Sequence, residues 1–253
     1  MNSTFVWYDL MTTDPAAAKT FYGAVVGYRT EPSPANPAYE MLFCPRGAIG
    51  GVMQMPEEAA AMGTPTHWLA YIQVADVAAG AARVLDLGGH IMTRFSIPTV
   101  GDVAIFRDPT GGVAALFQPA YAGSTKGGRP EHGEVSWNEL ATDDLEAAWT
   151  FYTGLLGWTK TDEMDMGPGG PYRMYGAPGR EGSLGGFFVR PPEMPVSCWT
   201  YYITVDDLDA ALVRVAEHGG RVLNGPMEVP GGDRVAQCMD PQGGAFALHG
   251  FGG

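Results

Sequence analysis

The N-terminal segment of the chain has the pattern of a strand followed by a helix. The run Phe5–Met11 consists of bulky side chains with the polar Asp9 among them, which is typical of a strand with one buried face. Asp14 can accept hydrogen bonds from the first turn of a helix that has Pro15 at its first position. Gly27 can end this helix, because glycine adopts the left-handed conformation of a C-terminal cap without strain. We therefore expect a βα unit here.

The rest of the first half repeats this plan with further strands. A second helix is expected over Asp76–Leu87, because Gly88 and Gly89 follow it and can stop it. The segment 108–111, Asp-Pro-Thr-Gly, has the composition of a hairpin turn. The expected strands are Tyr39–Cys44, Ile49–Met55, Trp68–Val74, Gly101–Arg107 and Val113–Gln118.

The second half of the chain is a copy of the first. The segment "VSWNELATDDLEAAWTFYTGLLGW" from Val135 corresponds to "FVWYDLMTTDPAAAKTFYGAVVGY" from Phe5. The spacing between matched residues hardly drifts along the copy, which indicates a tandem duplication. Matched pairs are Trp7 and Trp137, Tyr22 and Tyr152, Trp68 and Trp199, and Asp108 and Asp240. Strands of the second copy are expected from about Val135, Tyr172, Leu184, Trp199, Arg234 and Ala245, and its helices over Asp144–Leu156 and Asp206–His218.

Each copy also divides in half, so the βα plan occurs four times. We expect an α+β fold of four βαβββ modules in two tandem domains, with curved, mostly antiparallel sheets. The first domain is expected over 1–121, with modules at about 4–56 and 66–119, and the second over 133–253, with modules at about 133–191 and 197–250. The Gly-, Pro- and charge-rich segment 122–132 is the expected linker. The modules can pair within each copy, or the first can pair with the last.

The repeated segments resemble the vicinal oxygen chelate superfamily, which contains glyoxalase I, bleomycin-resistance proteins and extradiol dioxygenases. "TDPAAAKTFYGAVVGY" and "TDDLEAAWTFYTGLLGW" look like the first helix of that family. "FRDPTGGVAALFQ" and "CMDPQGGAFALHG" look like its closing hairpin. The resemblance covers essentially the whole chain. It implies paired modules that curl into open cups, each around a pocket.

The same resemblance implies that metal enzymes of the family take four ligands, usually His, Glu or Gln, inside a cup. The matching positions here are Trp7, about Gly50, about Leu69 and Ala115 in the first copy, and Trp137, about Gly185, about Thr200 and Ala247 in the second. None of these is a useful ligand for a divalent metal. We therefore expect no metal and no other cofactor, and no glyoxalase or dioxygenase activity. A metal site built from the five His residues stays an alternative, although they show no HxH or HxxxH spacing.

Aromatic side chains with a few polar groups are expected to line the cups instead. Alternate side chains share a strand face, so each cup can be read from its strands. Such a lining is typical of small-molecule sites, although these aromatic residues could also simply fill the cups. The expected ligand-binding residues are Trp7, Met11, Tyr39, Leu69, Tyr71 and Phe117 in the first copy, and Trp137, Tyr172, Thr200, Tyr202 and His249 in the second.

Asp9 and Glu139 are the candidates for chemistry. Each shares a strand face with Trp7 or Trp137, so each is expected to be partly desolvated, which would raise the pKa of its carboxyl. Such a group can receive a ligand hydroxyl or amine, or act as a general base. The alternative is a carboxylate that neighbouring Tyr or backbone donors satisfy, or one that lies in water.

Composition narrows the setting. With 45% hydrophobic and 17% charged residues the chain is not expected to be disordered. A net charge of −13 disfavours nucleic acid and anionic membranes as partners. Three widely spaced Cys residues without CxxC favour a reducing, cytoplasmic setting. No apolar stretch approaches about 18 residues, so we expect no membrane span.

The leading hypothesis is metal-free binding of a hydrophobic or aromatic small molecule, as in bleomycin-resistance proteins. The second hypothesis is a metal-independent enzyme of natural-product metabolism, a lyase, an isomerase or a hydroxylation-assisting protein, with Glu139 or Asp9 as general base. A third is a regulator or assembly factor whose cups are filled by its own side chains. The ligand, the functional cup and the choice between monomer and homodimer stay open.

Overall fold

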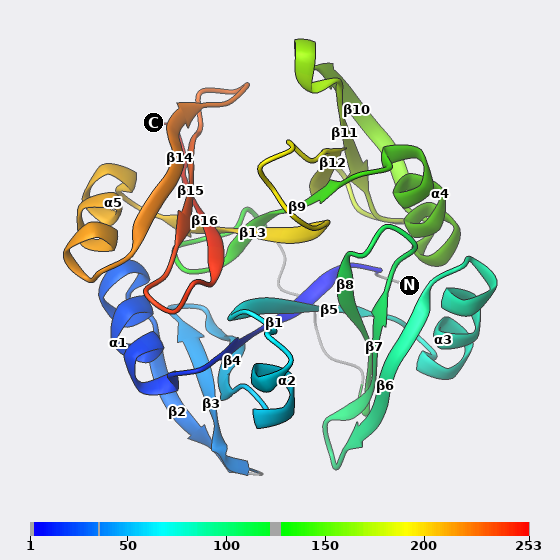
Figure 1. Cartoon of the computed structure of the whole chain (residues 1–253), viewed down its shortest axis with the longest axis horizontal. Helices are drawn as coiled ribbons and strands as arrows, with labels where there is room; N and C mark the ends of the chain where they lie inside the picture. Colours follow the sequence, from blue (N-terminus) through cyan, green and yellow to red (C-terminus); the bar gives the residue numbers. More distant parts are fainter. Residues whose placement is uncertain (1–2, 35, 122–127, 253) are drawn as a thin grey trace. The chain divides into compact units, whose positions relative to one another are not determined.

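The computed structural model describes residues 3–34, 36–121 and 128–252. Within them the chain has the expected α+β fold, built from two eight-stranded open sheets (Figure 1). The strand orders are β2-β3-β4-β1-β5-β8-β7-β6 and β10-β11-β12-β9-β13-β16-β15-β14. The second order repeats the first strand for strand, so the duplication seen in the sequence is a duplication of the fold.

Four βαβββ modules make up these sheets. Module 1 consists of β1 (Phe5–Thr12), α1 (Pro15–Val26), β2 (Arg29–Ser33), β3 (Asn36–Cys44) and β4 (Gly47–Gln54). Module 2 consists of β5 (His67–Gln73), α3 (Val77–Asp86), β6 (His90–Ile97), β7 (Gly101–Arg107) and β8 (Val113–Pro119). Module 3 consists of β9 (Val135–Thr142), α4 (Leu145–Leu156), β10 (Thr159–Asp165), β11 (Pro171–Gly176) and β12 (Gly185–Val189). Module 4 consists of β13 (Cys198–Val205), α5 (Leu208–Glu217), β14 (Arg221–Glu228), β15 (Arg234–Met239) and β16 (Ala245–Gly250).

Short additional elements lie in the connections. The helix α2 (Glu57–Ala61) joins module 1 to module 2, and a 3-10 turn, η1 (Gly167–Gly169), joins β10 to β11. In each module the first strand pairs in parallel with the last, as β1 does with β4, and the other pairs are antiparallel. The helix between them makes the parallel crossover possible.

The helix ends follow the signals in the sequence. Asp14 accepts a 3.0 Å hydrogen bond from the Ala17 N–H, and Gly27 ends α1 with a φ of 81°. Asp144 and Gly157 do the same for α4. The cap of α5 is Asp207, one residue beyond the expected start of this helix at Asp206, since the Asp207 carboxylate accepts from the third residue beyond it.

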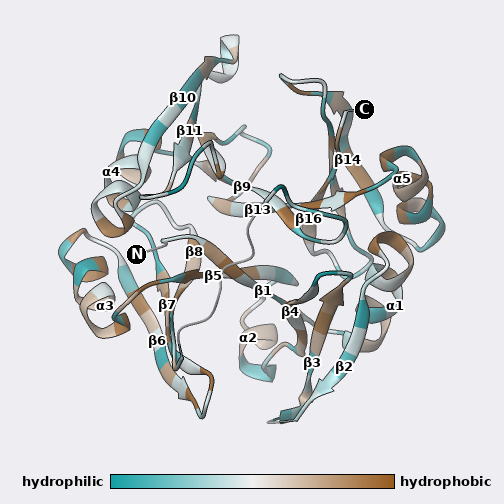
Figure 2. Cartoon of the chain, turned by 180° about the vertical axis from the view of Figure 1, so that it is seen from behind, coloured by the Kyte–Doolittle hydropathy of each residue, from teal (hydrophilic) through white to brown (hydrophobic). Residues whose placement is uncertain are grey.

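Four strands carry no clear signal in the sequence, namely β2, β6, β10 and β14. Each is an outer strand of its sheet, and most of its side chains are exposed. Figure 2 shows hydrophilic stretches on β2 and β10. Because such a strand buries neither face, its sequence needs no alternation of apolar and polar residues.

The described chain forms two compact units that combine modules from both copies. The first unit contains 3–6, 70–121 and 137–199, mainly modules 2 and 3. The second contains 7–34, 36–69, 128–136 and 200–252, mainly modules 1 and 4. Within them α3 packs on α4 and α1 packs on α5, respectively (Figure 1). Of the expected linker, 122–127 lies outside the described residues, and 128–132 belongs to the second unit.

A buried Trp–Tyr–Asp chain joins the two modules of each unit. In the first unit Trp199 Nε1 donates to the Tyr152 hydroxyl over 3.0 Å, and this hydroxyl donates to Asp108 Oδ2 over 2.9 Å. In the second unit Trp68 Nε1 donates to Tyr22 and Tyr22 donates to Asp240 Oδ2, each over 3.0 Å. Helix and turn motifs of different modules therefore meet at a hydrogen bond.

Burial and hydrogen bonding oppose one another at these two Asp carboxyls. Burial raises the pKa of Asp108 and of Asp240, while the Tyr hydroxyls and turn N–H groups lower it, with a net rise. The Oδ1 atom of Asp108 accepts from the N–H groups of Thr110 and Gly112. Each of these Asp residues therefore forms its turn through Oδ1, as expected, and also accepts a hydrogen bond through Oδ2 from a Tyr of another module.

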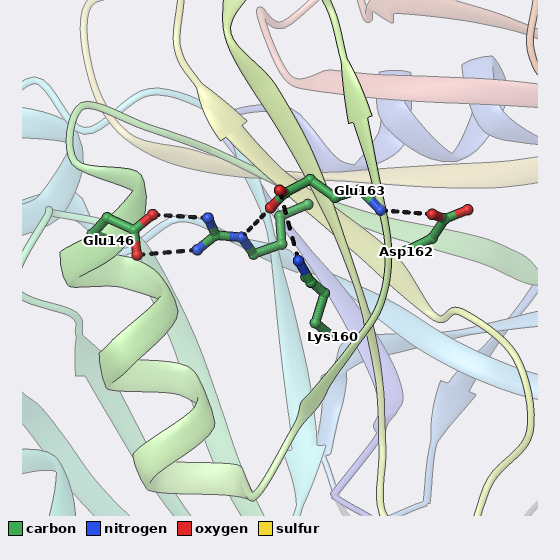
Figure 3. Close-up of polar contacts among 5 residues, drawn as sticks. Glu146, Lys160, Asp162 and Glu163 are labelled. Carbon is green, nitrogen blue, oxygen red and sulfur yellow. Dashed lines mark hydrogen bonds and ion pairs between the residues drawn. The ribbon is translucent and has the colours of Figure 1, made fainter.

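An exposed ion-pair network ties α4 to the β10–β11 hairpin in the first unit (Figure 3). The Arg173 guanidinium contacts Glu146 at 2.8 Å and Glu163 at 2.6 Å, and it lies over the Trp149 ring. Its hydrogen bonds hold the pKa of both carboxyls below the ordinary value. Both carboxylates are substantially exposed, so water and salt screen these pairs.

Candidate functional site

In the second unit, Trp7, Asp9 and Tyr39 form one hydrogen-bonded group. Trp7 Nε1 donates to the Tyr39 hydroxyl oxygen over 2.7 Å and to Asp9 Oδ1 over 2.9 Å. The Tyr39 hydroxyl donates to the same Asp9 oxygen over 2.6 Å. Trp7 and Asp9 are two apart on β1 and so share a face, and Tyr39 reaches them from β3. The carboxylate therefore fixes the orientation of both aromatic rings.

The first unit contains the same arrangement built from the second copy. Trp137 Nε1 donates to the Tyr172 hydroxyl over 2.7 Å, and this hydroxyl donates to Glu139 Oε1 over 2.8 Å. The longer Glu139 side chain reaches Tyr172, which is the counterpart of the Tyr39 that Asp9 reaches in the first copy. The type of each group is thus preserved in both copies although the length of the acid differs.

A glycine makes room for each Tyr. Gly51 pairs with Asp9 between β4 and β1, and Gly186 pairs with Glu139 between β12 and β9. A Cβ at Gly51 would lie 2.2 Å from Tyr39 Cζ, and one at Gly186 would lie 2.3 Å from the Cζ of Tyr172. The Tyr rings therefore lie directly over these glycines on their way to the carboxylates. A glycine pair repeated inside a strand, Gly50–Gly51 and Gly185–Gly186, is the signal in the sequence that indicates this close approach.

The acids of both groups are buried and the indoles are half-buried. Asp9 is 4% exposed and Glu139 7%. Trp7, Trp137 and Tyr39 keep part of their surface accessible, whereas Tyr172 is buried. A buried carboxylate is stable only when donors satisfy it, and the Tyr hydroxyls do this here. The expectation of a carboxylate satisfied by a neighbouring Tyr thus describes the geometry, while its role in binding or catalysis stays a prediction.

The remaining predicted site residues lie in both compact units. Met11 on β1 is half-buried and Leu69 on β5 is buried, both in the second unit. Tyr71 and Phe117 lie in the first unit, with ring centroids 6.5 Å apart in an edge-to-face contact. Of the second copy's residues, Thr200 and Tyr202 are buried on β13, and the Tyr202 hydroxyl accepts from Gln237 Nε2 over 3.2 Å.

His249 has protein partners on both ring nitrogens. Its Nδ1 lies 2.7 Å from Ser136 Oγ, and its Nε2 lies 3.1 Å from Asp233 Oδ2. The sequence predicts His249 as a pocket residue, but it gives no signal that Ser136 and Asp233 meet it, because the three lie on separate segments. Burial lowers the pKa of this imidazole more than the Asp233 hydrogen bond raises it.

The residues that the resemblance places at the family's metal positions do not fit a divalent metal. Trp7 and Trp137 carry an indole N–H, which only donates, and Leu69, Ala115 and Ala247 are hydrocarbon. Gly50 and Gly185 have no side chain, and a Cβ there would lie 1.8 and 1.9 Å from a backbone oxygen of the neighbouring strand. Thr200 alone offers an oxygen. Within the described ranges, no three His, Cys, Asp or Glu side chains gather in a group that could hold a metal.

The four βαβββ modules in two copies are the architecture of a tandem glyoxalase-like protein. The family model described as glyoxalase/bleomycin resistance protein/dioxygenase superfamily matches residues 134–248, and the one described as glyoxalase-like domain matches 6–117. The chain belongs to this superfamily.

Relatives over nearly the whole chain carry two kinds of name. A protein of Mycobacterium tuberculosis named putative glyoxylase CFP32 is 34% identical over 247 residues, which cover 96% of this chain and 92% of that protein. The anthracycline biosynthesis protein DnrV of Streptomyces peucetius is 37% identical over 260 residues, 96% of this chain and 91% of that protein. DauV, from a Streptomyces species and with the same description, is 30% identical with equal coverage.

Solved structures share the fold at low sequence identity. The Mn(II)-bound glyoxalase from Novosphingobium aromaticivorans has a TM-score of 0.68 and 14% identity, with 98% of this chain and 82% of that chain covered. The 2,3-dioxygenase LapB from a Pseudomonas strain has a TM-score of 0.67 and 13% identity, covering 98% and 92%. Among the described helices, none has the length and apolar character that crossing a membrane requires.

Proposed function

We propose that this protein binds a flat, hydrophobic or aromatic small molecule against Trp7 or Trp137, without a metal. The observation that carries the proposal is the repeated Trp–Tyr–carboxylate group. In both copies the resemblance implies that a half-buried indole stands at the family's first metal position, and a hydrogen bond from its N–H fixes the ring. A ring held in this way presents its face to a ligand at little further cost in conformational entropy.

The relatives favour a polycyclic aromatic compound of natural-product metabolism as the ligand. Two relatives at 37% and 30% identity are named anthracycline biosynthesis proteins, and anthracyclines are polycyclic aromatic compounds. The buried carboxylates of Asp9 and Glu139 accept hydrogen bonds, so they suit a ligand whose phenol hydroxyls can donate to them. The donor set at the metal positions supports binding without a metal.

Calorimetry with 1,4-dihydroxyanthraquinone tests the proposal. The protein is first dialysed against a chelator, and binding is then measured for the wild type and for Trp7→Leu and Trp137→Leu. Loss of one stacked ring and of its buried contact surface is expected to weaken binding about tenfold or more in the copy that binds. The matched control is Trp149→Phe on α4. Unchanged affinity in both Leu variants, or binding that needs added metal, would contradict the proposal.

A metal-independent enzyme is the second candidate function. The observation that favours it is the pairing of a buried acid with a phenol, Glu139 with Tyr172 and Asp9 with Tyr39, in which a general base lies beside a proton donor. Glu139→Gln or Asp9→Asn is then expected to abolish conversion of a bound aromatic substrate while changing its affinity little. Product formation, followed by mass spectrometry, that survives in the double variant would exclude this mechanism.

A further inference from the structure

Ser136, His249 and Asp233 form a hydrogen-bonded chain in the second unit that the proposed binding function does not use. The Ser136 hydroxyl lies 2.7 Å from His249 Nδ1, and His249 Nε2 lies 3.1 Å from Asp233 Oδ2. The serine belongs to β9, the histidine to β16, and the aspartate to the loop before β15. The end of the β15–β16 hairpin and the remote strand β9 thus bring together a hydroxyl, an imidazole and a carboxylate.

The carboxylate fixes which ring nitrogen carries the proton. An ionised Asp233 only accepts hydrogen bonds, so Nε2 must be the N–H donor toward it. In a neutral imidazole Nδ1 then has a free lone pair. Because Nδ1 cannot donate, the Ser136 hydroxyl must donate to it at 2.7 Å, in preference to the Tyr202 carbonyl at 3.2 Å. His249 is therefore oriented as a base toward the serine.

The surroundings keep this imidazole neutral and in place. The His249 side chain is 11% exposed, and burial is the main reason that its pKa is lowered. The Phe251 ring packs on it with centroids 4.5 Å apart, and the Arg129 guanidinium covers that ring at 3.5 Å. Asp233 is held in turn by the Gly252 N–H at 2.8 Å and by Arg129 at 3.6 Å.

The first copy of the duplication lacks this chain. Val6 corresponds to Ser136, and Phe117 corresponds to His249. Both counterparts are apolar, so the matching part of the fold does not need a polar group at either place. The serine and the histidine therefore occur together in one copy and are absent together from the other. This is expected if the two residues act in the same site.

We propose that Ser136 is a nucleophile, activated by His249 and positioned through Asp233, that accepts an acyl group from a small carboxylic ester. The Ser136 oxygen forms a bond to the carbonyl carbon while its proton passes to His249 Nδ1. The bond between that carbon and the alcohol oxygen then breaks, and the alcohol leaves with the proton from Nδ1. Water, deprotonated by the same nitrogen, releases the carboxylic acid and restores the serine.

The test is acylation of the purified full chain by 4-nitrophenyl acetate. Release of 4-nitrophenolate is followed by absorbance, and the adduct is located by peptide mass spectrometry. We expect an acetyl group on Ser136, and a rate that falls about 100-fold or more in Ser136→Ala and in His249→Gln. Ser183→Ala is the matched control, because the Ser183 hydroxyl bonds to a Thr hydroxyl and not to an imidazole. An adduct elsewhere, or an unchanged rate in Ser136→Ala, overturns the proposal.

Asp233→Asn separates positioning from structure. Asn keeps an oxygen for the Gly252 N–H, but its NH₂ would face Nε2 and favour the tautomer with the proton on Nδ1. Nitrogen NMR of His249 is then expected to show the proton moved to Nδ1, with acylation lost and the melting temperature little changed. Acylation at the wild-type rate after this shift overturns the role of Asp233. Binding of the anthraquinone at Trp7 or Trp137 does not depend on Ser136, so the two proposals fail separately.

Discussion

Tyr152 donates a 2.9 Å hydrogen bond to Asp108, which lies in a turn of another module. Tyr22 makes the equivalent bond to Asp240, from the first module to the last. The helix motif that contains each Tyr and the turn motif that contains each Asp occur in both copies of the chain. Their repetition is therefore explained by their contact, since each helix needs the turn of the module with which it packs.

Removing one of these hydroxyls is expected to destabilise the protein. Tyr152→Phe leaves the buried Asp108 Oδ2 without this donor, which costs about 1–3 kcal/mol of the free energy of unfolding. The pKa of Asp108 is expected to rise further, because the Tyr152 hydrogen bond lowers it in the wild type. Tyr22→Phe should have a similar effect through Asp240. Denaturant unfolding measures the change.

Tyr121→Phe is the control, because the Tyr121 side chain is 73% exposed. It should leave the denaturation midpoint unchanged. If Tyr152→Phe and Tyr22→Phe unfold at the same midpoint as this control, the two hydrogen bonds contribute nothing to stability.

A methyl group at either crowded glycine is expected to displace a Tyr. Gly51→Ala places a Cβ within 2.2 Å of Tyr39, and Gly186→Ala does so within 2.3 Å of Tyr172. The ring must move away, so its hydroxyl loses Asp9 or Glu139, and the indole N–H loses its bond to that hydroxyl, although Trp7 keeps its bond to Asp9. We expect a red shift of tryptophan emission and a loss of stability of about 1–3 kcal/mol, from the hydrogen bond that the buried acid loses and from the repacking.

Gly23→Ala on α1 is the matched control. Its Cβ would lie 3.5 Å from the nearest atom, an ordinary contact, and alanine favours a helix over glycine by up to about 1 kcal/mol. This variant should be neutral or more stable. If both Gly51→Ala and Gly186→Ala keep wild-type emission and stability, the Tyr rings can stay in place beside a methyl group and the prediction is wrong.

Much of the fold could be predicted from the sequence because the inner strands and the helices have one buried face. The runs Gly101–Arg107 and Phe5–Met11 are rich in β-branched and aromatic residues, and Asp14 and Gly27 delimit α1. The outer strands, such as β10, were not indicated individually, since both of their faces meet water. Which modules form a compact unit depends on contacts between distant segments, and the alternation along one strand contains no information on these contacts.

The candidate site could be predicted only in part, for the same reason. Strand alternation places Trp7 beside Asp9 and Trp137 beside Glu139, since these pairs are two residues apart. It does not indicate that Tyr39 bonds to Asp9. That contact depends on the register of β3 and on the space that the missing side chain of Gly51 leaves for the Tyr39 ring. Partners that are remote in sequence need the assembled sheet.

The exposed Arg173 network should matter little to stability. Arg173→Gln removes the ion pairs with Glu146 and Glu163, so the pKa of both acids is expected to return toward the ordinary value. Their pKa is depressed in the folded protein, so this contribution is present at neutral pH and is lost as the pH falls through the acid range. Thermal unfolding of the variant should differ slightly from the wild type at low salt and not at high salt. A large difference that persists in high salt would contradict a screened surface network.

His249 is expected to make the free energy of unfolding depend on pH. Burial lowers its pKa below the ordinary 6.5 of the unfolded chain, despite the Asp233 hydrogen bond that raises it, and the Arg129 charge lowers it further. The unfolded state therefore binds the proton more readily, so the free energy of unfolding decreases as the pH falls through 6.5 and levels off below the folded pKa. Proton NMR of the imidazole gives that pKa directly. His249→Gln should flatten the decrease in this window, whereas His90→Gln, at an exposed residue, should not. A folded pKa at or above 6.5 would mean that the Asp233 charge outweighs burial, and the decrease in the free energy of unfolding below pH 6.5 would then be absent.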